Sequence, residues 1–470
     1  MTGLYARIAA QVALRAGELA LLCDGRAWTY AQLDAEVSLW CARLAGDGIG
    51  RGDALGWLGL NSVAMLAALL ACARRGVRFV PLNWRLTAPE LAQLVRHAGL
   101  DALHADAALA ALADAVRALA PLTDREPAAR AGAEAAGGDD LLLVYTSGTG
   151  GRPKGAIHTQ AAMRANIDAA IEAQAFDAAT RALAVLPMFH VGGLCIQVLP
   201  VLAAGGAVNL HARFDAGAWL ADVETWRPST SLLVPATMRA LLEHARWAAT
   251  DLSSLAFVNT GSSIVPRALI DAFHARGVPV CQVYGATETG PVTLVLRTDE
   301  ALQHAGSAGR PALGVEVRLQ DGELHVRAPN LARGYHGEPG SPAFAEGWFR
   351  TGDLARVDDE GYYEIVGRVA DRIISGGENI DPAEIEQIAS ADPAVAEAAV
   401  VGVADAQWGE VPVLVVVLRP AAVADWSALR AAFDAKLARF KHPRRIVVLD
   451  ALPKTALGKV RRTELAQRLV

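Results

Sequence analysis

The sequence has little cysteine and little net charge. Its five cysteines are Cys23, Cys41, Cys72, Cys195 and Cys281. They are odd in number and form no C-x-x-C pair, which argues against a disulfide framework or structural zinc and favours a reducing compartment. A formal net charge of −6 and a pI near 6.0 supply no basic surface for nucleic acid or an anionic membrane. The apolar start of the chain is broken by Arg7 and Arg15, which argues against a secretory signal. We therefore expect a cytoplasmic protein that binds no nucleic acid.

Two stretches lack Lys, Arg, Asp and Glu altogether, namely residues 54–73 and 182–210. Each is long enough to cross a bilayer, for which about 20 apolar residues suffice. Pro187, Pro200 and paired glycines interrupt the second stretch, and the first reads as a buried strand that turns into a helix. Because parallel strands covered on both faces are continuously apolar, we favour a buried α/β core over a membrane span, and we expect a protein that is not transmembrane.

Most of the chain alternates short apolar runs with segments of helical periodicity, and its 470 residues suggest two or three domains. The predicted strands are 141–145, 183–186, 207–210, 231–234, 256–259 and 280–284, and the predicted helices between them include 161–175 and 236–247. This alternation is typical of parallel sheets. The segment 121–140 is rich in Pro, Ala and Gly and is predicted to be a surface linker.

After about residue 350 the pattern changes to alternating apolar and polar residues with turn signals, which indicates short antiparallel strands. Beyond residue 372 we predict a helix at 382–390, strands near 397–403 and 412–418, and a pair of helices flanking residues 440–445. These elements form a compact α+β unit of about a hundred residues.

Residues 146–155 read TSGTGGRPKG and follow the apolar run LLLVY. A Walker A loop requires G-x-x-x-x-G-K-[ST]. Counted from Gly148 the sixth position is Pro153, and counted from Gly150 the second glycine is followed by Ala156, so the motif fails. The dinucleotide pattern G-x-G-x-x-G fails at Pro153 as well. Converging backbone amides, hydroxyl groups and Lys154 nevertheless favour a bound phosphate over a surface glycine hairpin.

The order [ST]-S-G-T-x-G-x-P-K-G after an apolar strand resembles the phosphate loop of the adenylate-forming (AMP-binding) superfamily, which includes acyl-CoA synthetases, aryl-CoA ligases, luciferases and adenylation domains of peptide synthetases. Further segments resemble that superfamily in the same order: PMFHVGG (187–193), YGATETG (284–290), GSAGRP (306–311), WFRTGDLA (348–355), GRVADRIISGGENIDPAEIE (367–386) and LPKTALGKVRR (452–462). Together they span nearly the whole chain.

The resemblance implies an α/β fold. A large N-terminal domain of mostly parallel β-sheets sandwiched by helices (residues 1–369) would carry the ATP and acyl sites. A mobile α+β C-terminal domain (370–470) would be joined to it by a hinge at Asp371. The implied reaction joins a carboxylic acid to coenzyme A in two steps, through an acyl-adenylate with release of pyrophosphate. ATP, Mg²⁺ and coenzyme A are the implied cofactors.

The resemblance also implies roles for individual residues. The catalytic residues it implies are Lys459, Glu288, Thr287 and His190, with Glu288 also the ligand of Mg²⁺. The cofactor-binding residues it implies are Thr146, Ser147, Gly148, Thr149, Lys154, Tyr284, Gly285, Asp353, Arg368, Gly376 and Gly377. Lys459 would bridge the acid and phosphate oxygens, Asp353 would bind the ribose, and Gly376 and Gly377 would line the thiol tunnel. Lys441 and the Arg444–Arg445 pair are candidates for the phosphates of coenzyme A.

Four alternatives to these roles remain open. Lys459 is otherwise a solvated surface lysine, His190 a histidine in the core, Tyr284 a core aromatic and Asp353 a turn aspartate. Two departures from the family pattern bear on binding: Gly150 stands where a hydroxyl residue is usual, which predicts a weaker grip on ATP, and Ser262–Ser263 replace a more typical G-G-A-P segment near the acyl pocket.

Two segments lack residues that particular classes of acid would need, and this restricts the predicted substrate. VCQV before YGATETG has no arginine for a second carboxylate, and PMFHVGGLCIQV has no aspartate for an amino group. We therefore predict an apolar monocarboxylic acid, and the whole chain most resembles fatty-acyl-CoA synthetases. Aryl-CoA ligases, o-succinylbenzoate–CoA ligases and a stand-alone enzyme that loads an acyl carrier protein are alternatives. From another class, a non-catalytic nucleotide or acyl sensor is also open, as is a homodimer.

Overall fold

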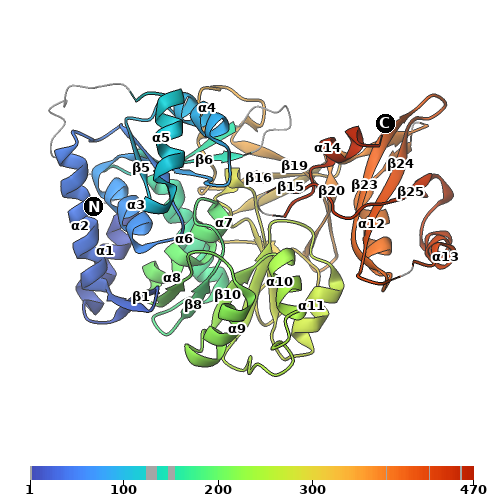
Figure 1. The fold of residues 1–470 in the computed structure, drawn as a ribbon, viewed down its shortest axis with the longest axis horizontal. Coiled ribbons are helices and arrows are strands. Elements are labelled where there is room, and N and C mark those ends of the chain that lie inside the picture. The colour runs from blue at the N-terminus through green and yellow to red at the C-terminus, as the bar shows by residue number, and fades with distance from the viewer. Residues whose placement is uncertain are drawn as a thin grey trace.

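The computed structural model describes residues 3–122, 135–146, 154–376, 378–422, 424–455 and 458–469. Figure 1 shows a large body, coloured blue to yellow, with a smaller orange-to-red part beside it that holds the C-terminus. The large body contains two mostly parallel sheets layered with helices, and the small part is an α+β unit. The predicted fold class is confirmed.

The first sheet has the strand order β14-β13-β12-β11-β10-β8-β9-β1-β2. The run from β12 to β1 is parallel, and the strands outside that run pair antiparallel. Its strands are β1 (Leu19–Cys23), β2 (Arg26–Thr29), β8 (Arg181–Ala184), β9 (Ala207–Leu210), β10 (Thr230–Leu233), β11 (Phe257–Gly261), β12 (Val280–Tyr284), β13 (Leu294–Val295) and β14 (Arg310–Pro311). All six strands predicted as candidates lie in this sheet or the next, although β8 begins two residues earlier than expected.

The second sheet has the order β17-β7-β6-β4-β3-β5, parallel from β6 to β5 and antiparallel at β7 and β17. Its strands are β3 (Ala54–Leu58), β4 (Arg78–Leu82), β5 (Ala102–Ala105), β6 (Asp140–Thr146), β7 (Lys154–Thr159) and β17 (Gly334–Tyr335). All five residues of β3 are buried, as expected for a strand covered on both faces. The centre of the predicted linker, 123–134, lies outside the described residues.

Helices fill three layers around these sheets, as the hydrophobic clusters show. The helices between the sheets are α1 (Tyr5–Arg15), α2 (Tyr30–Gly46), α3 (Val63–Arg75), α6 (Gln160–Gln174) and α8 (Leu199–Ala204). The outer helices are α4 (Ala88–Ala98) and α5 (Ala110–Leu119) on the second sheet, and α9 (Ala216–Thr225), α10 (Pro235–Leu242) and α11 (Arg267–His274) on the first. The helix predicted at 236–247 is therefore too long, because α10 ends at Leu242.

An antiparallel sheet follows, with β16 between β15 and β19, and with β18 and β20 both paired to β19. Its strands are β15 (Glu316–Gln320), β16 (Glu323–Arg327), β18 (Phe344–Ala345), β19 (Trp348–Val357) and β20 (Tyr363–Arg368). We expected the antiparallel pattern only after about residue 350, and this was wrong, because it begins at β15. The hairpin of β15 and β16 turns at Asp321 and Gly322, both with positive φ.

The last sheet contains β21 (Ile373–Ser375), β22 (Glu378–Ile380), β23 (Val395–Asp405), β24 (Gly409–Leu418) and β25 (Arg445–Val448). Its helices are α12 (Pro382–Ser390), α13 (Trp426–Lys436) and α14 (Arg462–Gln467). Two helices flank residues 440–445 as predicted, but β25 was missed. It pairs parallel with β24, and the run Ile446–Val448 was its β-branched signal.

The two charge-free stretches form core elements. Residues 54–73 are β3 followed by α3, whose N-cap Ser62 accepts a hydrogen bond from the amide of Met65. Residues 182–210 are divided into β8, a short α7 (Val191–Gly193), a π-helical segment (Leu194–Val198), α8 and β9. Within the described ranges, no helix has both the length and the apolar character needed to span a bilayer.

Candidate active site

The phosphate-loop motif connects two adjacent strands. Thr146 ends β6 and Lys154 begins β7, and the two residues are paired across the strands. The Thr146 hydroxyl donates to the Lys154 carbonyl oxygen at 3.4 Å. The predicted Ser147, Gly148 and Thr149, together with Gly150, lie outside the described residues. The structure thus positions both ends of the predicted loop at the carboxyl end of β6.

Lys154 and Glu288 are joined through a third residue that the sequence analysis missed. The Lys154 ammonium lies 4.9 Å from the centre of the Tyr335 ring, within range of a cation–π interaction. The Tyr335 hydroxyl donates to Oε1 of Glu288 at 2.7 Å. Burial and the neighbouring Glu288 charge raise the pKa of Tyr335, so the phenol is neutral and donates. Three segments far apart in the sequence thus supply one polar cluster.

Buried side chains hold in place the turn that carries Thr287 and Glu288. Nε2 of His158 lies 2.8 Å from the Thr287 carbonyl oxygen. Burial lowers the pKa of His158 to about 4, so its ring is neutral at pH 7 and the nitrogen facing the carbonyl is the protonated one. Asn330 donates to the carbonyl oxygens of Thr289 and Val292 at 2.8 and 2.9 Å. The Glu288 carboxylate is therefore held by a rigid turn.

Gly285 is required by close backbone packing. A Cβ atom at this position would lie 1.7 Å from the carbonyl oxygen of Pro291, which no side chain tolerates. Glycine at this position therefore lets the backbone after Tyr284, at the end of β12, run close to Pro291 as it enters the turn that carries Glu288.

Tyr284, Asp353 and Arg368 form a connected group. The Tyr284 hydroxyl donates to Oδ2 of Asp353 at 2.8 Å, and Nε of Arg368 lies 2.8 Å from Oδ1. Burial raises the pKa of Asp353, against the opposing effects of Arg368 and the Tyr284 hydrogen bond. Asp353 and Arg368 face each other in the register of β19 and β20, so a strand pair positions this carboxylate.

Lys459 reaches the same place from the C-terminal end of the chain. Burial and the Arg368 charge lower the pKa of Lys459, while Asp353 and Asp371 act against them. Lys459 is still exposed to solvent, so the neighbouring residues surround its side chain without closing it off. A Cβ atom on Gly458 would lie 3.5 Å from Cβ of Ala236 at the start of α10. The lysine loop is therefore docked against the large body, beside Asp353 and Arg368.

Comparison with known proteins identifies this arrangement. A profile of the family described as AMP-binding enzyme matches residues 8–336, and one for the AMP-binding enzyme C-terminal domain matches residues 384–459. The chain belongs to the AMP-binding enzyme family. It is therefore an acid–thiol ligase of the AMP-forming type, which uses ATP and coenzyme A.

Relatives of this AMP-binding enzyme match it over most of both chains. It is 41% identical to the indoleacetate–CoA ligase of Aromatoleum aromaticum, over 97% of this chain and 96% of the relative. It is 38% identical to a feruloyl-CoA synthase of an Amycolatopsis species, over 94% of each chain. The solved structure of the anthranilate CoA ligase AuaEII with anthranoyl-AMP has a TM-score of 0.91, with 25% identity, over 99% of this chain and 97% of that chain. The predicted fatty-acid substrate is not confirmed by these matches, and the aryl alternative fits them better.

His190 is hydrogen-bonded to residues of its own segment of this AMP-binding enzyme. Its Nδ1 accepts a hydrogen bond from the Gly192 amide at 3.2 Å. Burial lowers the pKa of His190 to about 4, so the ring is neutral at pH 7. Among the described residues no hydrogen bond or ion pair joins it to Lys459 or Glu288.

The other predicted C-terminal residues lie in consecutive segments at the start of the small unit. Asp371 is in a 3₁₀ turn, Val369–Asp371. Gly376 has a φ of +60°, and a Cβ atom there would lie 2.7 Å from the Trp408 ring. Gly377 lies outside the described residues. Trp408 was not predicted; the residue is 39% exposed, and tryptophan is enriched at contact surfaces.

The basic residues predicted for coenzyme A have intramolecular partners. Lys441 lies 2.6 Å from Glu384, and Arg445 donates to the Leu469 carbonyl oxygen at 2.8 Å. The Arg444 guanidinium lies 5.6 Å from the Trp408 ring centre. Arg444 is thus the one of the three that lies beside the exposed tryptophan.

The residues present fit a magnesium ion that arrives with ATP. Within the part of the chain that the structure describes, no group of three or more His, Cys, Asp or Glu side chains is arranged to hold a metal by itself. Glu288 is a single carboxylate with one oxygen engaged by Tyr335. Mg²⁺ is commonly bound by one or two carboxylates together with substrate phosphates and water, so Glu288 suits this mode.

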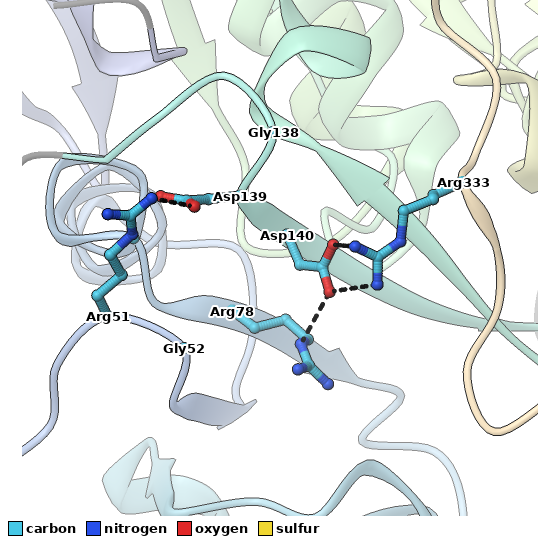
Figure 2. Close-up of a pocket in the computed structure, with 8 residues that line it drawn as sticks. Arg51, Gly52, Arg78, Gly138, Asp139, Asp140 and Arg333 are labelled. Carbon is cyan, nitrogen blue, oxygen red and sulfur yellow. Dashed lines mark hydrogen bonds and ion pairs between the residues drawn. The ribbon is translucent and has the colours of Figure 1, made fainter.

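A cavity of about 230 Å³ on the large body is separate from these residues. Its lining consists of Arg51, Gly52, Gly76, Arg78, Gly138, Asp139, Asp140 and Arg333. Figure 2 shows its side chains already paired with one another, with Arg51 on Asp139 at 2.7 Å and Arg333 on Asp140 at 3.0 Å. Asp140 begins β6 and Thr146 ends it, so at about 3.3 Å per residue the cavity lies about 20 Å from the phosphate loop. It is separate from the predicted nucleotide site.

Proposed function

We propose that this enzyme activates an aromatic monocarboxylic acid as its acyl-AMP and transfers the acyl group to coenzyme A. The observation that carries the reaction is the position of Lys459, whose loop packs against the start of α10 at Gly458 and brings the ammonium within range of the Asp353 and Arg368 charges. The observation that supports an aromatic acid is the similarity to ligases named for indoleacetate, ferulate and anthranilate.

The nucleotide would bind between the two polar groups described above. Asp353 would accept the ribose hydroxyls, with Arg368 and Tyr284 holding its carboxylate in place. Tyr284 and Gly285 would pack against adenine. Thr146, Ser147, Gly148, Thr149 and Lys154 would bind phosphate oxygens, and Thr287 would contact the α-phosphate. Mg²⁺ held by Glu288 and the phosphates would neutralise negative charge on the departing pyrophosphate.

In the first step, a carboxylate oxygen of the acid forms a bond to the α-phosphorus of ATP, and the bond from that phosphorus to pyrophosphate breaks. The carboxylate is ionised at neutral pH, so no base is needed. Lys459 would contact the carboxylate and phosphate oxygens where negative charge concentrates, which is electrostatic catalysis by a positioned cation. His190, neutral as described above, would orient the acid.

In the second step, the thiol sulfur of coenzyme A attacks the acyl carbon, AMP leaves, and the thiol proton passes to solvent. We propose that residues 370–470 rotate at Asp371 between the two steps, as a hinge residue absorbs the change in φ and ψ. Lys459 would withdraw, and Gly376 and Gly377 would line the path of the thiol. Arg444 beside Trp408 would meet a phosphate of coenzyme A, and Lys441 and Arg445 would have to exchange their present partners to do so.

The test measures pyrophosphate release from Mg·ATP across a panel of acids, with and without coenzyme A. The panel contains indoleacetate, ferulate, anthranilate, o-succinylbenzoate and fatty acids of increasing chain length. We expect the highest kcat/KM with an aromatic acid and acyl-CoA as the product. A preference for fatty acids would restore the first substrate prediction. If pyrophosphate is released and a carrier protein is loaded but no acyl-CoA forms, the acceptor is the carrier protein and not coenzyme A. No acid-dependent release at all would favour the nucleotide or acyl sensor.

A further inference from the structure

Arg462, three residues after Lys459, makes polar contacts with three separate segments of the chain. Its Nη1 donates to the Val400 carbonyl oxygen in β23 at 2.6 Å. Its Nη1 and Nη2 together bind both carboxylate oxygens of Glu386 in α12. Its Nε lies 3.1 Å from Oδ2 of Asp371. One guanidinium thus ties a strand, a helix and the 3₁₀ turn to the first residue of α14.

These contacts are shielded from solvent. The side chains of Arg462, Asp371 and Glu386 are 25%, 27% and 16% exposed. Burial opposes the positive charge, but Glu386 and Asp371 together raise the pKa of Arg462. A planar guanidinium can bind one carboxylate with two nitrogens and still offer Nε to a second one, whereas an ammonium cannot. The site is therefore built for arginine.

The segment between Arg462 and the lysine loop is short and internally bonded. The Arg461 amide donates to the Pro453 carbonyl oxygen at 2.8 Å, and the Thr455 amide donates to the Lys459 carbonyl oxygen at 2.7 Å. These bonds close the loop into a hairpin whose base is next to Arg462. A displacement of Arg462 is therefore transmitted to Lys459.

The three partners of Arg462 differ in one respect. Glu386 and Val400 belong to the same folded unit as Arg462, since α12 and β23 pack together in one core. Asp371 belongs to the turn between that unit and β20, which ends at Arg368. Any rotation of the unit at this turn changes the position of Asp371 relative to Arg462, and leaves the bonds to Glu386 and Val400 intact.

We propose that Arg462 is a positioning residue for Lys459, and that its ion pair with Asp371 favours the arrangement in which Lys459 lies beside Asp353 and Arg368. The pair keeps the lysine loop in register with the turn during acyl-AMP formation, and it must break before the unit rotates. This inference rests on the proposed two-step function, because it assigns the pair to the first step alone.

The test compares the two half-reactions in Arg462→Lys, Asp371→Asn and the double variant. Acyl-AMP formation is followed by pyrophosphate release in a single turnover, and thioester formation starts from supplied acyl-AMP and coenzyme A. Because a misplacement of about 1 Å can cost up to about a hundredfold in rate, we expect each single variant to slow the first half-reaction at least about tenfold. Thioester formation should be unchanged or faster, and the double variant should resemble the slower single one.

Arg468→Lys is the matched control, since Arg468 lies at the end of the same helix and pairs with Glu464 at the surface. It should leave both half-reactions unchanged. Asp371→Asn keeps the bonds to Glu386 and Val400, so it remains informative if Arg462→Lys fails to fold. An equal loss in both half-reactions, no loss in either, or additive losses in the double variant would overturn the inference. Wild-type enzyme that releases no pyrophosphate with any acid would instead refute the proposed function.

Discussion

The hydroxyl of Tyr335 donates a hydrogen bond of 2.7 Å to the Glu288 carboxylate, across 47 residues of sequence. The same ring receives the Lys154 ammonium on its face. One aromatic side chain therefore sets the distance between the cation of the phosphate loop and the carboxylate expected to bind Mg²⁺.

Replacing Tyr335 with Phe keeps the ring and removes this hydrogen bond. Loss of a hydrogen bond of about 0.5–1.5 kcal/mol that orients Glu288 predicts a Michaelis constant for Mg·ATP that is several-fold higher. Steady-state kinetics at saturating acid measure it. Tyr363→Phe is the control. The Tyr363 amide in β20 donates a hydrogen bond to the Gly309 carbonyl oxygen, and this backbone bond is kept when the hydroxyl is removed. An unchanged constant for Mg·ATP in the Tyr335 variant would show that Glu288 needs no such support.

Replacing Lys459 with Ala should slow acyl-AMP formation by roughly 10²–10³, the usual cost of removing a group that stabilises developing charge. Thioester formation from supplied acyl-AMP should persist, because the lysine would not contact the second transition state. Pyrophosphate release and acyl-CoA formation are measured separately. The exposed Lys436 at the end of α13 supplies the control variant Lys436→Ala. Equal damage to both half-reactions would contradict the two-face scheme.

Replacing Gly376 with Ala should impair thioester formation more than acyl-AMP formation. The new Cβ atom would meet the Trp408 ring at 2.7 Å, and a φ of +60° is strained for alanine. Gly409→Ala separates the two effects, since Gly409 also has a positive φ of +80° but only a distant neighbour at 3.7 Å. If both variants lose thioester formation equally, backbone strain is responsible and the Trp408 contact is not.

The buried His158 predicts a stability that depends on pH. Its pKa is lowered from 6.5 to about 4, so between these values the unfolded chain binds a proton that the folded protein does not. The contribution of neutral His158 to the free energy of unfolding should therefore be complete above pH 6.5 and be lost as the pH drops toward 4. The loss from this one group is at most roughly 3–4 kcal/mol.

His158→Gln tests this, because glutamine can donate to the Thr287 carbonyl oxygen and does not titrate. Urea unfolding between pH 4 and pH 7.5 should show a flatter pH dependence in the variant than in the wild type. His190, whose pKa is also lowered to about 4, should retain its share of the slope. Parallel pH curves for the two proteins would mean that His158 is not the titrating group.

The sequence by itself determined the fold class, and its motifs named the candidate site residues. Continuous apolar runs between helical patterns predict parallel strands covered on both faces, as β3 and β6 show. Asp353, Glu288 and Lys459 were named through motifs that resemble the AMP-binding superfamily, and this needs no coordinates because each motif is a short contiguous segment. Element ends were less predictable: α10 ends earlier than its periodicity suggested, and β25 was hidden between two helices.

Only the tertiary structure decided which residues meet. Tyr335 and His158 have no periodic or motif signal that relates them to the 287–289 turn, yet His158 bonds to it across 129 residues of sequence. Likewise the bonds from Arg462 to Glu386 and Val400 span 76 and 62 residues. A local pattern reports whether a residue faces the core, because burial depends on its neighbours in one element. The identity of a hydrogen-bond partner depends on how distant elements pack, and that is settled only when the chain has folded.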